Sequence, residues 1–200
     1  MPTRVVGVVG SFVATYKATR ERGRRVRRSR RWTGRRAGGL LAGMRELSRD
    51  ELSSCCASAA WVSKVSARGP FRDLGDLLRA GEEALAELTW ADVLEALAAH
   101  PRIGERPAGE GREAAWSRAE QAGTAEAGRE LLDRLREGNA AYERRFGHVF
   151  LVCATGKTAA EMLELLEKRL ANDEETERKV VREELSAIVR PRLTKLWEGA

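Results

Sequence analysis

Apolar residues recur at helical spacing from about residue 44 to the end of the chain, and this pattern limits the fold more than any other feature. Two long segments show it most clearly, with Met162, Leu163, Leu165, Leu166 and Leu170 in the first and Val181, Leu185, Ile188, Leu193 and Leu196 in the second. Residues three or four positions apart share one face of a helix, and an apolar face must be buried against other elements. The chain is therefore predicted to be all-α.

Three polar residues mark where helices should begin. Ser48 stands three residues before Glu51, and Thr158 stands three residues before Glu161, which is the spacing of a capping box. Thr89 precedes another apolar-periodic stretch as a possible single cap. Helices are therefore predicted to start just after residues 48, 89 and 158.

The remaining segments complete a bundle. Further helices are predicted for an apolar stripe of Leu52, Cys55, Cys56 and Ala59, for a short stretch with Leu74, Leu77 and Leu78, for residues 85–99 as a helix or helix pair, for residues 114–123 and for residues 126–146. Residues 101–112 are rich in Pro, Gly and charge and should form a surface loop. Residues 148–154, HVFLVCA, are the only strand candidate and are predicted to be extended or a buried connector. We expect one compact multi-helix domain with a short extended segment.

Charge divides the chain into two regions. Residues 1–43 hold twelve Lys or Arg and one Glu, whereas residues 44–200 hold 24 basic and 29 acidic residues. Like charges in such a block repel one another, so residues 1–43 are predicted to be a disordered basic extension of a helical domain over residues 44–200. The extension could attract nucleic acid or a membrane surface, or Met44 could be the natural start. Its composition also resembles that of a mitochondrial transit peptide.

The sequence argues against several classes of protein and site. No apolar run is long enough to cross a bilayer, and the apolar VVGVVGSFV precedes the arginines instead of following them as in a secretory signal. Cys55, Cys56 and Cys153 have no metal-binding or redox spacing, which suits a reducing cytosol. ATGKT at 154–158 lacks the opening glycine of a phosphate-binding loop. With two histidines and no paired ligand motif, no bound metal is expected.

His100 is the first candidate for chemistry. It ends a helical stretch and is followed by Pro101, which disfavours a helical conformation for the residue before it and has no N–H. The imidazole is therefore held at a helix end, although a surface histidine at a helix stop would give the same pattern.

The segment WSRAEQAG is the second candidate. Ser117 and Glu120 are three residues apart, so their side chains project from one face of a helix, with Trp116 on a neighbouring flank. An aromatic ring beside a carboxylate can desolvate it and raise its pKa towards the range for proton transfer. A solvated helical Glu would show the same spacing.

Five motifs occur in one order along the chain: HPRIGE, WSRAEQAG, YERRFGHVFLVCATGK, RLANDEE and IVRPRLTKL. In this combination, residues 44–200 resemble the family of 2-oxo-4-hydroxy-4-carboxy-5-ureidoimidazoline (OHCU) decarboxylases, which complete the conversion of urate to (S)-allantoin. HPRIGE paired with S-x-x-E-Q-A-G is specific to that family. The resemblance implies a compact helical fold, usually a homodimer, without a metal or organic cofactor. We expect a cytoplasmic enzyme that acts on a small molecule, without a membrane or nucleic-acid partner.

The resemblance also implies roles for individual residues. His100 and Glu120 would be catalytic, and the substrate would contact Pro101, Ser117, Gln121, Phe150, Leu151, Val152, Cys153, Ala154 and Arg192. Ser117, Glu120 and Gln121 would hold the imidazoline and ureido groups, the backbone of residues 150–154 would line the pocket, and Arg192 would meet an anionic part of the substrate.

Two departures from the family pattern affect this assignment. His148 stands where the family often has an aromatic residue, so it could be a pocket wall or a packing substitute. Pro191 should kink or end the last helix, which leaves the direction of Arg192 open.

The implied chemistry needs few groups. Loss of CO₂ leaves an electron pair on the ring carbon that carried it, and fixed hydrogen-bond donors can stabilise the resulting charge. His100 could deprotonate the substrate or protonate the carbanion, and an ordinary histidine pKa of about 6.5 suits both roles. Two other interpretations remain: a helical nucleic-acid-binding module that uses the Arg-rich extension, and a helical interaction protein without catalysis.

Overall fold

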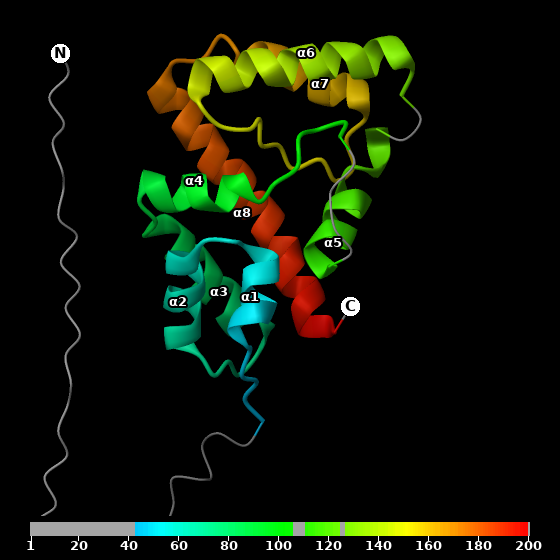
Figure 1. Cartoon of the computed structure of the whole chain (residues 1–200). Helices are drawn as coiled ribbons and strands as arrows, with labels where there is room; N and C mark the ends of the chain where they lie inside the picture. The colour runs from blue at the N-terminus through cyan, green and yellow to red at the C-terminus, as the bar shows by residue number, and fades with distance from the viewer. Residues whose placement is uncertain (1–42, 106–110, 125–126, 200) are drawn as a thin grey trace, which may run out of the picture. The chain divides into compact units, whose positions relative to one another are not determined.

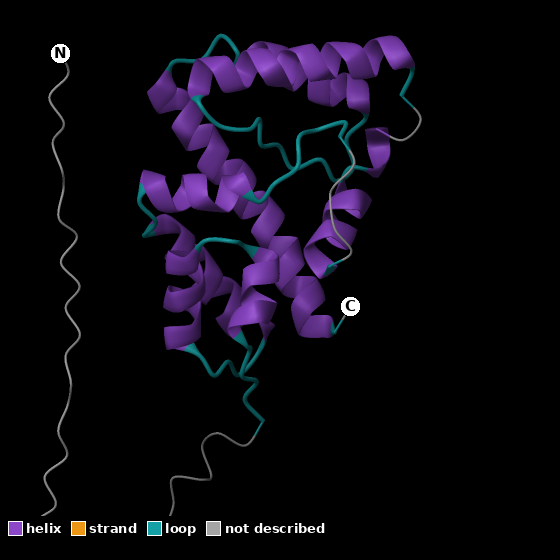
Figure 2. Cartoon of the chain, in the orientation of Figure 1, coloured by secondary structure: helices purple, strands orange, loops and turns teal. Residues whose placement is uncertain are grey.

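A computed structural model describes residues 43–105, 111–124 and 127–199. Within these ranges the chain forms eight α-helices and one short 3₁₀ helix, and no β-strand is present (Figure 2). The elements are α1 (Arg49–Cys55), α2 (Ala59–Arg68), α3 (Leu74–Ala86), α4 (Trp90–Ala98), α5 (Arg112–Glu120), η1 (Ala122–Thr124), α6 (Arg129–Phe146), α7 (Ala159–Arg169) and α8 (Glu174–Glu198). The predicted all-α fold is confirmed, whereas the predicted disordered extension lies, except for Gly43, outside the described residues. None of the described helices is long and apolar enough to cross a membrane.

Three helices begin at the residues that the sequence marks. Ser48 and Thr158 form complete capping boxes with Glu51 and Glu161 and start α1 and α7. Thr89 forms a third box with an aspartate and starts α4. The side-chain oxygens accept hydrogen bonds from N–H groups that the first turn of a helix cannot satisfy internally, which fixes each start.

Two predicted helices have different boundaries in the structure. Residues 52–59 are not one helical stripe, because α1 ends at residue 55 and the hydroxyl of Ser58 caps α2. Ala59 is consequently exposed on the first turn of α2. Leu85 belongs to α3 and not to the next helix, since the box at Thr89 sets a new start. The other helices fall within a few residues of their predicted positions.

The sequence predicts that Pro191 kinks or ends the last helix. It does not end the helix, because α8 runs through it from Glu174 to Glu198. A proline inside a helix leaves the carbonyl four residues earlier without its usual donor. Here that carbonyl belongs to Ala187, and the Cys153 thiol lies 3.7 Å from it as a weak donor. Buried residues on both sides of Pro191 keep the helix packed, so tertiary burial outweighs the local cost.

The core consists of two hydrophobic clusters. The first cluster contains buried side chains of α1, α2, α3, α4 and α8. The second cluster contains buried side chains of α6 and α7 together with Ile103, Phe150, Val152 and Ala154. In Figure 1, α6 and α7 lie side by side, and α8 extends away from them past α3, which it contacts. The long helix α8 therefore connects the two parts of the core.

The segment 148–154 is the buried connector that the sequence predicts. It pairs with no strand, yet its side chains alternate in direction. Phe150, Val152 and Ala154 enter the second cluster, whereas Leu151 enters the first. A period of two is that of extended backbone, so this short stretch contributes side chains to both clusters.

Candidate active site

A pocket lies where the two clusters meet. Its walls come from the loop after α4, from α5, from the segment 148–154 and from α8, and consist of His100, Pro101, Ile103, Ser117, Glu120, Gln121, Phe150, Leu151, Val152, Ala154 and Ile188. Its cavity volume is about 20 Å³, and the wider space between the lining atoms, part of which is open solvent, is about 320 Å³. In Figure 1 the loops that follow α4 and α6 run between α6 and α4 towards α5. All predicted site residues except Cys153 and Arg192 line this pocket.

His100 reaches the pocket from just beyond the C-terminal end of α4. Its Nδ1 lies 2.9 Å from the carbonyl oxygen of Ala96. A carbonyl oxygen can only accept a hydrogen bond, so Nδ1 carries the hydrogen and Nε2 carries the lone pair. Nε2 is buried and has no hydrogen-bond partner among the described residues. It is therefore available to accept a proton from a bound molecule.

Burial and charge keep His100 neutral. Burial lowers its pKa most strongly, and the nearby Arg192 cation lowers it further, to about 4. The hydrogen bond to Ala96 and the charge of Glu120 act in the opposite direction without offsetting this. At neutral pH the imidazole is therefore uncharged and can act as a base. An ordinary histidine pKa of about 6.5 would leave open whether His100 accepts or donates the proton.

Arg192 and Glu120 form an ion pair beside the pocket. Arg192 donates from Nε and Nη2 to the two carboxylate oxygens of Glu120, at 2.9 and 2.7 Å, and Nη2 also donates to the Ser117 hydroxyl at 3.2 Å. Only 1% of the Arg192 side chain is exposed. Burial opposes the cation, but the hydrogen bonds and charge of Glu120 raise the pKa of Arg192. The pair joins α5 to α8 and fixes the direction of Glu120.

Two buried polar atoms of this region lack a protein partner within the described ranges, Nε2 of His100 and Nη1 of Arg192. Buried polar groups in folded proteins are nearly always hydrogen-bonded, and of these two residues only His100 lines the pocket. One atom is an acceptor and the other is a charged donor. A molecule in the pocket with a proton to give would satisfy Nε2 of His100.

The loop after α4 is held from two sides. Gly104 N–H donates to Gln121 Oε1 at 3.2 Å, and Asn139 Nδ2 donates to the carbonyl of Ile103 at 2.9 Å. Gln121 follows α5, and Asn139 lies on α6. One residue after α5 and one residue on α6 thus fix the backbone of the loop that follows His100.

Cys153 and His148 lie outside the pocket. The N–H of Cys153 donates to Glu184 at 2.7 Å. His148 packs its ring against Trp90 and Tyr142, with ring centroids 5.4 and 5.5 Å apart, and lines a separate surface groove. The contacts of His148 therefore agree with the packing interpretation and not with a wall of this pocket.

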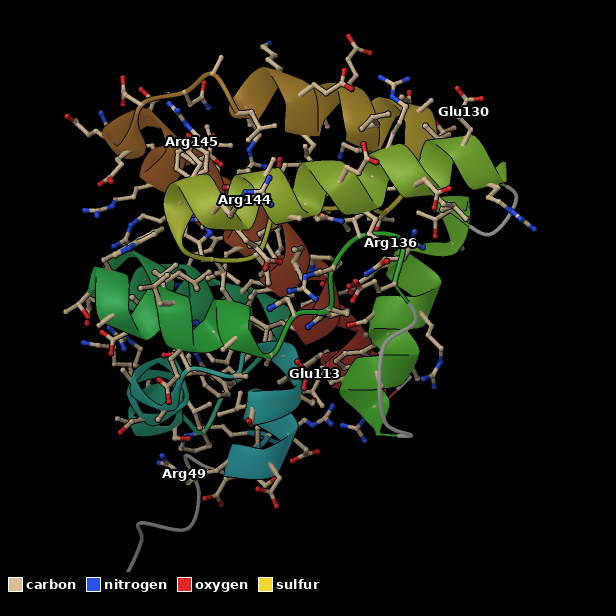
Figure 3. All side chains as sticks on the ribbon, turned by 45° about the horizontal axis from the view of Figure 1, so that its top comes forward. Arg49, Glu113, Glu130, Arg136, Arg144 and Arg145 are labelled. Carbon is tan, nitrogen blue, oxygen red and sulfur yellow. The ribbon has the colours of Figure 1, made fainter. Side chains whose placement is uncertain are left out.

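Sequence reasoning missed Glu113 and the two pocket residues Ile103 and Ile188. Glu113 lies one helical turn before Ser117 on the same face of α5, and in Figure 3 it stands between α5 and α1. Burial raises its pKa, and the Arg192 charge acts against this. The four-residue spacing from Ser117 is a signal that could have identified Glu113.

No metal-binding set occurs in the part of the chain that the structure describes, where no three His, Cys, Asp or Glu side chains come together as possible ligands. The two histidines lie apart in different cavities, His100 in the pocket and His148 in the separate groove.

Comparison with known proteins gives a consistent result. A protein-family model described as OHCU decarboxylase matches residues 44–194. The chain is 32% identical over 154 residues to the uric acid degradation bifunctional protein TTL of Arabidopsis thaliana, covering 76% of this chain and 46% of that protein. It is 33% identical over 142 residues to the 2-oxo-4-hydroxy-4-carboxy-5-ureidoimidazoline decarboxylase of Amia calva, covering 68% of this chain and 77% of that protein. The chain thus matches less than half the length of the plant protein.

Solved structures show the same likeness. A crystal structure of OHCU decarboxylase in the presence of (S)-allantoin aligns with a TM-score of 0.66 at 30% identity, covering 74% of this chain and 98% of that chain. A crystal structure of (S)-allantoin synthase aligns with a TM-score of 0.54 at 19% identity, covering 74% of this chain and 49% of that one, which shows a common fold.

Proposed function

The chain belongs to the OHCU decarboxylase family, and we propose that it converts OHCU to (S)-allantoin and CO₂, the last step of urate degradation to allantoin. The observation that carries this proposal is the buried lone pair on Nε2 of His100, which has no protein partner in the described residues and belongs to a residue that lines the pocket. The neighbouring Arg192–Glu120 pair supplies fixed charge at the same place.

The reaction requires one base and a fixed charge. In OHCU the carbon that loses CO₂ also carries a hydroxyl group. Conversion to allantoin removes the hydroxyl proton to make a ring carbonyl and breaks the bond to the carboxylate. It also adds two protons, one to the neighbouring carbon that bears the ureido group and one to the ring nitrogen double-bonded to that carbon; the hydroxyl group supplies one of them and solvent the other. We assign the first step to neutral His100, whose Nε2 accepts the hydroxyl proton while the electrons of the broken bond pass to the ring.

The other pocket residues bind and orient the substrate in this proposal. Glu120 and Ser117, held in place by Arg192, accept hydrogen bonds from the imidazoline and ureido N–H groups. Nη1 of Arg192 supplies a charge-assisted donor for the substrate's anionic oxygen. Pro101, Gln121 and the backbone of residues 150–154 complete the walls.

We also propose that the enzyme works without a metal or organic cofactor, as a cytoplasmic homodimer. A positioned base, a buried cation and oriented donors can supply the proton transfer and the charge stabilisation. Turnover should survive exhaustive dialysis against a chelator, and sedimentation should give the mass of two chains. Loss of turnover that zinc or another metal restores would contradict the first point, and a single-chain mass would contradict the second.

Circular dichroism tests the function directly. Purified protein is added to freshly generated OHCU, and the dichroism of the product is followed over time. Because spontaneous decay of OHCU yields racemic allantoin, rapid growth of one enantiomer supports the proposal. A product signal no different from that of the buffer alone would refute it.

A further inference from the structure

A buried polar network contacts the segment 148–154 without lining the pocket. Arg169, at the end of α7, donates from Nε and Nη2 to Glu177 at 2.9 and 2.6 Å. Only 6% and 1% of the two side chains are exposed. The hydroxyl of Tyr142 and the amide of Asn172 donate to the same carboxylate. Glu177 thus holds the buried guanidinium of Arg169, and Tyr142 and Asn172 hold Glu177.

The network anchors the backbone of the pocket wall. Nη1 of Arg169 donates to the carbonyl of Leu151 at 2.7 Å, and Glu184 on α8 accepts from the N–H of Cys153 at 2.7 Å. Lys157 donates to the carbonyl of Cys153, also at 2.7 Å. Nη1 of Arg169 and Oε1 of Glu184 are themselves 3.8 Å apart. Charged side chains therefore hold alternate residues of the segment, 151 and 153.

The anchored groups lie on one edge of the extended segment, because alternate residues direct their backbone polar groups to opposite edges. In extended backbone, the N–H and C=O groups of residues 151 and 153 leave one edge, and those of residue 152 leave the other. Within the described ranges no protein group hydrogen-bonds to the N–H or C=O of Val152, and Val152 lines the pocket. On this second edge the N–H and C=O of Val152 are a donor and an acceptor side by side. They are complementary to the C=O and N–H of an amide or ureido group.

A role in stability alone does not explain the network. Desolvation of two buried charges largely offsets their attraction, and apolar residues of similar size often stabilise a core as well or better. A guanidinium, however, can hold a carboxylate and a carbonyl at fixed angles at the same time. We propose that Arg169 and Glu184 are positioning residues, which anchor Leu151 and Cys153 so that the Val152 edge faces the substrate. The substrate part of this inference rests on the proposed function.

Cys153 reports directly on the anchored edge. It is partly exposed, whereas Cys55 and Cys56 are buried in the first cluster. Full-length protein is treated with a thiol reagent, and peptide mass spectrometry assigns the labelling rate of each cysteine. Glu184→Ala removes the acceptor of the Cys153 N–H and should speed labelling of Cys153 roughly tenfold to a hundredfold, the factor for one hydrogen bond to a charged group. Cys55 and Cys56 should stay slow.

Matched variants separate positioning from general stability. Glu184→Gln keeps an acceptor oxygen and should restore slow labelling of Cys153. Arg169→Lys keeps the charge, but a lysine cannot reach Glu177 and Leu151 together. Cys153 in this variant should therefore be labelled as fast as in Glu184→Ala. Lys168→Ala, on the exposed side of α7, should match the wild type. Equal acceleration of all three cysteines, or no change at Cys153, would overturn the positioning role.

Kinetics with OHCU test the substrate part. Glu184→Ala should raise KM about fivefold or more with a smaller change in kcat, because a displaced Val152 edge weakens ground-state binding. Glu184→Gln should return KM towards the wild-type value. An unchanged KM in a variant with fast Cys153 labelling would refute the substrate role. If even the wild type fails to turn over OHCU, the proposed function fails, while the labelling rates still decide whether the anchors exist.

Discussion

Arg192 and Glu120 form a two-pronged ion pair that joins α8 to α5 beside the pocket, with N–O distances of 2.9 and 2.7 Å. Arg190, only two residues away, is paired on the surface with Glu82. The two arginines therefore point to different sides of α8. Because the Arg192 pair is buried, it couples the stability of the fold to the direction of a pocket carboxylate.

Arg192→Ala should lower the free energy of unfolding by about 3–5 kcal/mol, because removing one partner leaves a carboxylate without its cation. Arg192→Lys should recover part of this loss, but it loses the fork and should raise the KM for OHCU more than it lowers kcat. Urea unfolding and Michaelis parameters provide the measurements. Arg190→Ala is the matched control and should cost about 0.5 kcal/mol or less, since its pair is exposed. A silent Arg192→Ala beside a damaging Arg190→Ala would contradict the structure.

His100→Asn should reduce kcat by roughly 10² or more, the effect of removing a positioned base. The far-ultraviolet circular dichroism spectrum should match that of the wild type, because among the described residues the ring makes a single hydrogen bond, to Ala96. Stopped-flow measurement of CO₂ release would give kcat for both proteins. A variant that retains near wild-type kcat would show that another group accepts the proton.

The pH dependence of activity should show the lowered pKa of His100. Its pKa is about 4 in the folded protein, so the base form persists well below neutral pH. We expect kcat/KM to stay level from pH 8 to about pH 5 and to fall with an apparent pKa near 4. A fall centred at the ordinary histidine pKa of about 6.5 would mean that the imidazole is solvated in the free enzyme.

The same group should make the fold sensitive to acid. Since the folded pKa of about 4 lies below the ordinary value of 6.5, the unfolded chain binds a proton that the folded chain does not. Stability should therefore fall as the pH drops from about 6.5 to about 4, by about 3 kcal/mol in total from this residue. Urea unfolding of the wild type and of His100→Asn at pH 7 and pH 4.5 measures it. Equal pH slopes in the two proteins would contradict the assignment.

Deletion of residues 1–43 should leave a folded and active domain. The family match begins at residue 44, and the contact that ties this end to the fold, between the backbones of Arg45 and Phe71, remains in the shortened chain. Thermal unfolding and OHCU turnover of the shortened protein provide the measurement. Loss of cooperative unfolding would show that the extension contributes to the core.

Local sequence patterns were enough to predict most of the helices and three of their starts. Ser48, Thr89 and Thr158 cap helices because a side-chain oxygen three residues from a free N–H needs only local geometry. Apolar spacing likewise identified the buried face of α8, including Leu185 and Ile188. The motifs also named His100 and Glu120, which do line one pocket.

Tertiary structure alone decided the properties that depend on distant neighbours. The spacing of WSRAEQAG suggested that an aromatic ring acts on Glu120, but its partner is Arg192, 72 residues later, since only packing brings α8 against α5. α8 continues through Pro191 because burial on both sides outweighs a local penalty. The protonation state of His100 follows from burial and from the Arg192 charge. A local sequence pattern shows which residues can form a helix or a site. The pKa of a side chain and its ion-pair partner depend instead on all the charges and contacts around it in the folded chain.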